Sequence, residues 1–367
     1  MTPESIRWPN HPPRRSRCRR HATPSARSRS QSGMTLVELL VALVIGLLIV
    51  MVAVAALTAA RRGASTVDAA SQLRDDARFA SDLIQRLVVQ TGFEDITASS
   101  AAYRTSVADY KLKEGVDILT LHPNIYGFNN GKAKVSDPLN GKTAYASNAL
   151  GAGSDVLILR YQSVLPYPEA TAPDGSMISC HGFAPTVPPV NRDDRLASIL
   201  YVDANQGEPS LMCIALKEDG TFTTPAPLLK GVEIFQVLYG VDNVTAGAAP
   251  AATKPATSVP NSYLRADQLT VSGNEAATYA NWRRVRSVRI GMVLRGAPGS
   301  AQEATGTDYY PLGGPEFASA SDTRSKFTVN DSRLRQVVTF TVQLRNCQNQ
   351  GYQPATATTP CAVAMPS

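Results

Sequence analysis

A run of 22 uncharged residues, from Leu39 to Ala60, constrains this chain more than any other feature of its sequence. The run is rich in Leu, Val, Ile and Ala, and at a helical rise of about 1.5 Å per residue it matches a hydrocarbon core of about 30 Å. This length and composition predict one membrane-spanning helix. A secretory signal cut near residues 59–60 is disfavoured, because the apolar region of such a signal has only about 7–15 residues.

The formal net charge of +6 is concentrated ahead of the apolar run. Residues 1–33 hold eight arginines against Glu4 alone, which leaves 28 basic and 29 acidic residues for the rest of the chain. By the positive-inside rule, the basic segment is expected in the cytoplasm and the chain beyond about residue 61 on the other side of the membrane. The overall positive charge is therefore no indication of nucleic-acid binding.

Glu38 lies at the start of the apolar region, where a charge costs a few kcal/mol unless it has a partner. The segment that contains it, Gly33–Glu38 with the letters GMTLVE, resembles the N-terminal signature of the type IV pilin family, with Met34 in place of the commoner Phe. The resemblance implies that a prepilin peptidase cuts after Gly33, that Met34 is then N-methylated, and that Glu38 pairs with the new N-terminal amine of a neighbouring subunit. A single-pass signal anchor with an incidental glutamate is the alternative.

Beyond Arg62 the apolar residues recur at spacings of three and four as far as Val88, with charged residues between them, which is typical of an amphipathic helix. Thr91 and Gly92 supply a stop signal. One helix is therefore predicted over about residues 35–90. The resemblance implies three parts: a leader at 1–33 that is removed, a pilin helix at 34–92 with its transmembrane part at about 36–60, and a periplasmic β-rich domain at 93–367.

The rest of the chain has the pattern of β-strands. Apolar residues alternate with other residues around 288–294 and 338–344, and further strand candidates are 155–161, 199–202, 211–216 and 232–239. An antiparallel sheet packed against the helix follows, which gives an α+β fold. Two long loops are expected, Asn124–Gly153 and Ala246–Asn261, as partner-binding elements or as tolerated surface insertions.

Cys18 lies in the leader, and the remaining cysteines are Cys180, Cys213, Cys347 and Cys361. No pair has CxxC spacing, so two disulfides in an exported domain are expected rather than a zinc site. Neighbours in sequence are the favoured pairs, Cys180 with Cys213 and Cys347 with Cys361, because short loops close most readily. Three connectivities are formally possible.

The sequence contains little material for catalysis. Beyond residue 33 only His122 and His181 are available for a metal site or a catalytic triad, and no Walker-type phosphate loop occurs. No enzyme activity, cofactor or metal is therefore predicted. A basic cluster that could bind a single-stranded nucleic acid comprises Trp282, Arg283, Arg284, Arg286 and Arg289. The favoured interpretation of its alternating arginines is the solvent face of a strand.

Within the family, the chain is most similar to PilW-type minor pilins. The residues that carry this likeness are 87–93 at the helix end, the strand segments 153–157 and 231–240, and the closing segment 340–346. The likeness implies a minor pilin of the type IV pilus, anchored in the inner membrane, that primes assembly and enters the filament at or near its tip. The implied partners are a prepilin peptidase, other minor pilins, the major pilin, the inner-membrane assembly platform and a tip adhesin. A type II secretion pseudopilin of the J type and a tip adhesin or DNA-binding module are the alternatives.

Overall fold

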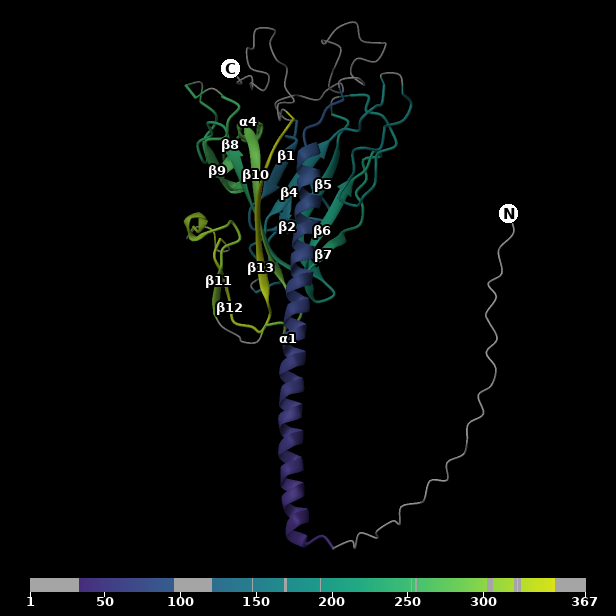
Figure 1. Cartoon of the computed structure of the whole chain (residues 1–367). Coiled ribbons are helices and arrows are strands. Elements are labelled where there is room, and N and C mark those ends of the chain that lie inside the picture. Colours follow the sequence, from purple (N-terminus) through teal and green to yellow (C-terminus); the bar gives the residue numbers. More distant parts are fainter. Residues whose placement is uncertain are drawn as a thin grey trace, which may run out of the picture. The chain divides into compact units, whose positions relative to one another are not determined.

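The structure is a computed structural model that describes residues 33–95 and 121–346, apart from 147, 168–169, 192, 252, 255, 302–305, 320–321 and 323–324. Residue contacts divide the chain into two compact units, Met1–Thr58 and Ala59–Ser367. The first unit contributes the start of a long helix, and the second contains the rest of that helix together with the strands of the described residues (Figure 1).

Helix α1 extends from Leu36 to Gln90, as the sequence predicts. In the second unit its buried side chains are spaced three or four residues apart, so that they form one stripe, which comprises Leu73, Ala77, Ala80, Ile84, Leu87 and Val88. Gly92, with φ of 77°, follows the last turn and supplies the left-handed conformation that ends many helices. Its N–H donates to the carbonyl oxygen of Arg160 at 2.9 Å, which fixes the end of α1 to the first sheet.

The first sheet has five antiparallel strands in the order β1–β4–β5–β6–β7. Their bounds are Ile125–Phe128, Val156–Tyr161, Leu196–Asn205, Glu208–Leu216 and Ala226–Lys230. Strands β5 and β6 form a hairpin closed by Gln206 and Gly207, whose φ angles are 53° and 81°. Positive φ at both turn residues matches the right-handed twist of the hairpin, which accounts for the glycine.

The second sheet has four antiparallel strands in the order β13–β10–β8–β9. Their bounds are Arg335–Gln343, Val285–Arg295, Val232–Val241 and Ser262–Leu264. The two sheets meet at Asp155, just before β4. Its N–H donates to the carbonyl oxygen of Phe235 at 2.8 Å, and its carboxylate accepts from the N–H groups of Val237 and Asn130, each at 2.8 Å.

Smaller elements complete the second unit: the hairpin β2 (Lys132–Ala133) and β3 (Lys142–Thr143), the short helices α3 (Ala266–Leu269) and α4 (Glu275–Trp282), the hairpin β11 (Thr307–Tyr309) and β12 (Phe327–Val329), and the 3-10 turn η2 (Pro315–Phe317). The main core contains the buried stripe of α1 and inward-facing residues of both sheets. Trp282 anchors it, with its ring centroid 4.7 Å from that of Tyr126 and 4.6 Å from that of Tyr239.

The predicted α+β class is confirmed, and every predicted strand segment coincides with an observed strand. Two expectations are corrected. The antiparallel structure is two principal sheets rather than one, and α1 packs with residues of both. The stretch 124–153, expected to be a long loop, contains β1 and the β2–β3 hairpin. The stretch 246–261 contains no helix or strand among its described residues, as a loop requires.

Candidate functional site

The N-terminal motif forms the beginning of α1. The N–H of Thr35 donates to Glu38 Oε2 at 2.9 Å, and the N–H of Glu38 donates to Thr35 Oγ1 at 3.3 Å. The Thr35 hydroxyl also donates to Glu38 Oε2, at 3.1 Å. These reciprocal bonds are a capping box, which satisfies N–H groups that the first turn of a helix leaves without partners. The carboxylate that the sequence singled out thus has donors within its own chain.

The part of α1 in the first unit is apolar on every side and exposed. Exposed fractions of its large apolar residues run from 49% at Leu39 to 73% at Leu36. Within the described residues, α1 is the single helix long and apolar enough to cross a membrane. A continuous apolar surface of this size is unstable in water and requires either lipid or other apolar helices around it. Together with the motif at Gly33–Glu38, this surface fits a membrane anchor.

The basic cluster at 282–289 is not a surface, and this prediction is wrong in both of its interpretations. Trp282, Arg283, Arg284 and Arg286 are 0%, 3%, 1% and 8% exposed. Arg284 Nη1 donates to the carbonyl oxygens of Asn243 and Lys254 at 3.0 and 2.8 Å. Arg283 donates to the carbonyl oxygen of Leu121, and Arg286 pairs with Asp242 at 3.6 Å. The guanidinium groups hold loop carbonyls, and so they are not available to phosphates.

Arg289 is half-buried and lies against residues that cover the outer face of β10. Its Nε and Nη2 donate to the carbonyl oxygen of Leu312 at 3.1 and 2.9 Å, and its guanidinium carbon lies 4.1 Å from the ring centroid of Phe317. This arrangement uses the flat guanidinium both as a hydrogen-bond fork and as a stacking surface.

An ion-pair network that sequence reasoning missed joins four strands. Arg335 Nε donates to Glu233 Oε2 at 2.7 Å, and Arg295 Nη2 donates to Glu208 Oε2 at the same distance, while Arg295 also pairs with Glu233 at 3.4 Å. Burial acts to lower the pKa of Arg335, but its bonds to Asp331 and Glu233 outweigh burial and raise that pKa. These pairs link β6, β8, β10 and β13, so their role is structural.

Cys180 and Cys213 form a disulfide with a Cα–Cα distance of 6.0 Å, which is the pairing that the sequence favoured. It joins the segment before β5 to strand β6. The second expected pair, Cys347 with Cys361, lies outside the described residues.

The two histidines have structural surroundings. His122 is near Tyr279, with 3.0 Å between Nδ1 and the phenol oxygen, and burial together with Arg160, Arg195 and Arg283 lowers the pKa of His122 to about 3. His181 Nε2 lies 3.2 Å from the carbonyl oxygen of Cys213 and 2.9 Å from Thr223 Oγ1. Across the described residues, no three His, Cys, Asp or Glu side chains gather as a metal site would need.

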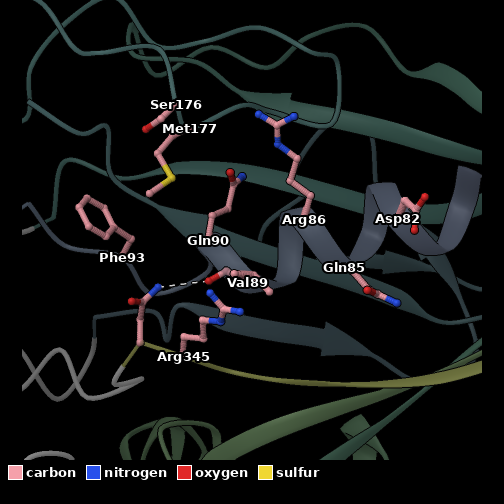
Figure 2. A pocket seen from close by; sticks show the side chains of 10 residues that line it. Asp82, Gln85, Arg86, Val89, Gln90, Phe93, Ser176, Met177 and Arg345 are labelled. Atoms are coloured by element: carbon pink, nitrogen blue, oxygen red, sulfur yellow. Dashed lines mark hydrogen bonds between the residues drawn. The ribbon is translucent and has the colours of Figure 1, made fainter. Parts of the chain in front are cut away.

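An open groove of about 550 Å³ lies beside the C-terminal end of α1 (Figure 2). Its lining comes from α1, the segment around Met177 and the segment after β13, where Asn346 Nδ2 donates to the carbonyl oxygen of Val89 at 3.3 Å. The titratable side chains of the lining are Asp82, Arg86 and Arg345. The lining also contains the Ser176 hydroxyl, and among the described residues of the groove no hydroxyl is hydrogen-bonded to a histidine or a carboxylate in the arrangement of an activated nucleophile.

Comparison with known proteins agrees with this geometry. The family model described as Type IV Pilus-assembly protein W matches residues 199–346, which run from β5 to the end of the described chain. The model of the prokaryotic N-terminal methylation motif matches residues 28–57, which include Gly33, Met34 and Glu38. No curated protein matches the chain.

Among solved structures, the chain is similar to the type IV-like pilin TTHA1219 from Thermus thermophilus. The two are 14% identical, and the alignment covers 75% of this chain and 98% of that one with a TM-score of 0.36, a likeness too distant to carry any argument by itself. The two family models carry the assignment, one at the N-terminal motif and one on the folded domain. The chain is therefore similar to type IV pilins at its N-terminal motif, and it is PilW-like over residues 199–346.

Proposed function

We propose that this protein is a minor pilin of a type IV pilus that primes filament assembly with other minor pilins and is built in at or near the filament tip. Before assembly it sits in the inner membrane by the apolar part of α1, with the folded domain in the periplasm. A prepilin peptidase removes residues 1–33, and Met34 becomes the methylated first residue. The work of the protein is packing and ion pairing, with no turnover.

The observation that carries the proposal is the exposed apolar half of α1 beginning at a capped glutamate. Lipid and a bundle of apolar helices offer similar surroundings to Leu and Val side chains, so moving from one to the other costs little. Glu38 is different, because a carboxylate moved into such a bundle loses water and needs a cation. The amine that cleavage creates on Met34 of a neighbouring subunit supplies that cation.

The capping box gives the carboxylate a partner before assembly. Bonds to Thr35 hold Glu38 while the chain waits in the membrane. Pairing with a neighbour's amine adds a charge-assisted bond, which is roughly twice as strong as a neutral one. The same side chain can thus be tolerated in the precursor and stabilise the filament.

The first test determines the mature N-terminus. Co-expression with a prepilin peptidase, followed by mass spectrometry, is expected to give a chain beginning with N-methylated Met34. An uncut chain, or one cut near residues 59–60, would return the protein to the anchored or secreted classes.

A second test separates the carboxylate from the cap. Glu38→Ala is expected to be processed normally and to lose piliation. Thr35→Val removes the capping hydroxyl, at a cost of about 0.5–2 kcal/mol to the helix end, but keeps the carboxylate, so it should still assemble. Equal loss in both variants would mean that the cap matters and the intersubunit pair does not.

A third test distinguishes a type IV pilus from a type II secretion system. Deletion of the gene should abolish twitching motility and leave protein secretion intact, in keeping with the pilus-assembly description of the matched family. The opposite result would favour the type II secretion pseudopilin. The DNA-binding alternative loses its support because three of its four arginines are buried and the fourth, Arg289, is held by Leu312 and Phe317.

A further inference from the structure

The segment 183–190, called here the display loop, points its apolar side chains into solvent. Phe183, Val187 and Val190 are 62%, 55% and 67% exposed. Scattered exposed apolar residues are ordinary on a protein surface, but three within eight residues of one loop form a cluster. Phe183 also borders a small hollow with Tyr161 and Leu196, and Val187 and Val190 border a second, open one, so more than half of each apolar side chain still faces solvent beside shallow hollows.

The backbone of the display loop is held in place by polar groups beneath it. Glu218 accepts from the N–H groups of Thr186 and Val187, and its other oxygen accepts from the Thr186 hydroxyl at 2.9 Å. Asp194 Oδ2 accepts from the N–H of Val190 at 2.9 Å. The Cys180–Cys213 disulfide fixes the chain three residues before the loop.

A surface insertion without a function would be expected to expose its polar side chains and to need no fixed backbone, and the display loop differs on both points. Polar side chains are used to hold the loop, while the apolar side chains are left to water. A loop fixed in this way loses little conformational entropy when a partner binds it, and pre-organisation of this kind increases affinity. The arrangement is that of a small binding element with Phe183 as its largest anchor.

The surroundings of the display loop are acidic. The described charged residues of segment 163–195 and of the turn 217–219 are five acidic and two basic, whereas the chain beyond residue 33 is nearly balanced; they are Asp174, Asp193, Asp194, Glu218 and Asp219 against Arg195 and Lys217. Asp174 is close to the loop, since a Cβ on its neighbour Gly175 would lie 3.9 Å from that of Ala184. Asp219 lies in the turn beside Glu218, and its carboxylate binds only its own turn and Lys217.

A lipid surface is a poor partner for this loop. The segment that leads into the loop lies against the C-terminal end of α1, because the Gln90 amide donates to the carbonyl oxygen of Ile178 at 2.6 Å. Residue 90 is about 45 Å along the helix from residue 60, where the apolar run ends. The acidic surroundings would also repel anionic lipid headgroups.

We infer that the display loop docks into a second protein, at an apolar pocket flanked by lysine or arginine side chains. Complementary charge favours encounter with such a surface and disfavours acidic ones. The inference goes beyond the proposed pilin function and does not depend on it. The inference would hold equally if the bound partner were not a pilin.

The test uses the full-length chain in cells that assemble the filament, with a photo-crosslinking benzoylphenylalanine in place of Phe183. The matched control carries the same group in place of Val259, which is 62% exposed in the separate loop 246–261. Irradiation should give a protein adduct at position 183 that is at least tenfold stronger than at 259. Peptide mapping should place it beside apolar and basic residues of the partner.

Charge reversal completes the test. Asp174→Lys with Asp219→Lys should reduce the adduct about tenfold, whereas Asp137→Lys with Asp308→Lys, at a partly exposed and an exposed site elsewhere, should not change it. Thermal unfolding checks that all variants remain folded. Equal labelling at 183 and 259, adducts with lipid only, or an adduct that is indifferent to the reversal would each overturn the inference.

Discussion

The Cys180–Cys213 disulfide allows the sharpest test of how the folded domain is stabilised. The bridge spans a sequence separation of 33. In the chain-entropy treatment, a loop of this length restricts the unfolded chain enough to stabilise the folded state by about 4 kcal/mol. For a domain whose urea dependence is about 3 kcal/mol per molar, the midpoint should fall by about 1.3 M when the bridge is opened.

The measurement is urea unfolding of the mature chain in detergent, followed by tryptophan fluorescence. Removal of residues 1–33 takes Trp8 with it and leaves Trp282 as the single probe. This ring is fully buried among core aromatic side chains, so it reports the global transition. Reduced wild-type protein and the double variant Cys180→Ala, Cys213→Ala are compared with the oxidised wild type.

Reductant also reaches Cys347 and Cys361, and the double variant separates their effect. The reductant should shift the wild-type midpoint and leave that of the double variant unchanged. If it shifts both proteins equally, the stabilisation comes from the other two cysteines. An unchanged midpoint in both the reduced protein and the variant would refute the reasoning, because the bridge would then not restrict the unfolded chain.

Two further predictions follow from buried charge. Burial raises the pKa of Asp155 to about 8, against the opposing bonds from Asn130 and Val237. Because the unfolded chain releases this proton near pH 4, the stability contribution is full below about pH 4 and falls by up to about 1.4 kcal/mol per pH unit as pH rises towards 8. The urea midpoints at pH 5 and pH 7 should therefore differ less in Asp155→Asn than in the wild type. An equal pH dependence of the midpoint in both proteins would contradict the raised pKa of Asp155. Arg284→Met removes the donor to two loop carbonyls and should lower the unfolding free energy by about 2–4 kcal/mol. The control Arg78→Met, on the exposed side of α1, should change it by less than about 0.5 kcal/mol. Equal effects of the two variants would show that Arg284 is not a structural donor.

Helix α1 was predictable because its two halves carry strong and different signals. An uninterrupted apolar run and a three-and-four spacing each define a helix, and Gly92 marks its end. The capping role of Thr35 was missed, although Thr35 and Glu38 have the spacing of a capping box. The family motif indicates an assembly role for Glu38, whereas the spacing to Thr35 indicates a local partner, and the two are compatible.

The stretch 124–153 shows where sequence patterns fail. Its Gly and Asn residues indicate turns, and turns are present, but strand β1 within it has only four residues. So short a segment contains too few positions for a period of two to be recognised. Strand β1 exists because it pairs with β4, a long-range contact that local sequence does not reveal.

The arginines around β10 show what an alternation of arginine and apolar residues does and does not predict. A period of two shows that a strand has two different faces, but it does not show that one face meets water. Strand β10 lies between β8 and β13 in its sheet, and each of its faces is covered. One face carries Val288, Ile290 and Met292 into the main core, while Val293 on the other packs with Phe327.

The same covering explains why Arg289 and Gly291 stand on that outer face. Arg289 reaches the carbonyl oxygen of Leu312, and a Cβ at Gly291 would lie within 2.2 Å of the carbonyl oxygen of Pro311. A chain segment that crosses a sheet brings carbonyl groups that need donors, and a guanidinium supplies several from one side chain. Arginines that alternate with apolar residues therefore indicate covered backbone as readily as they indicate a nucleic-acid surface, and burial decides between the two.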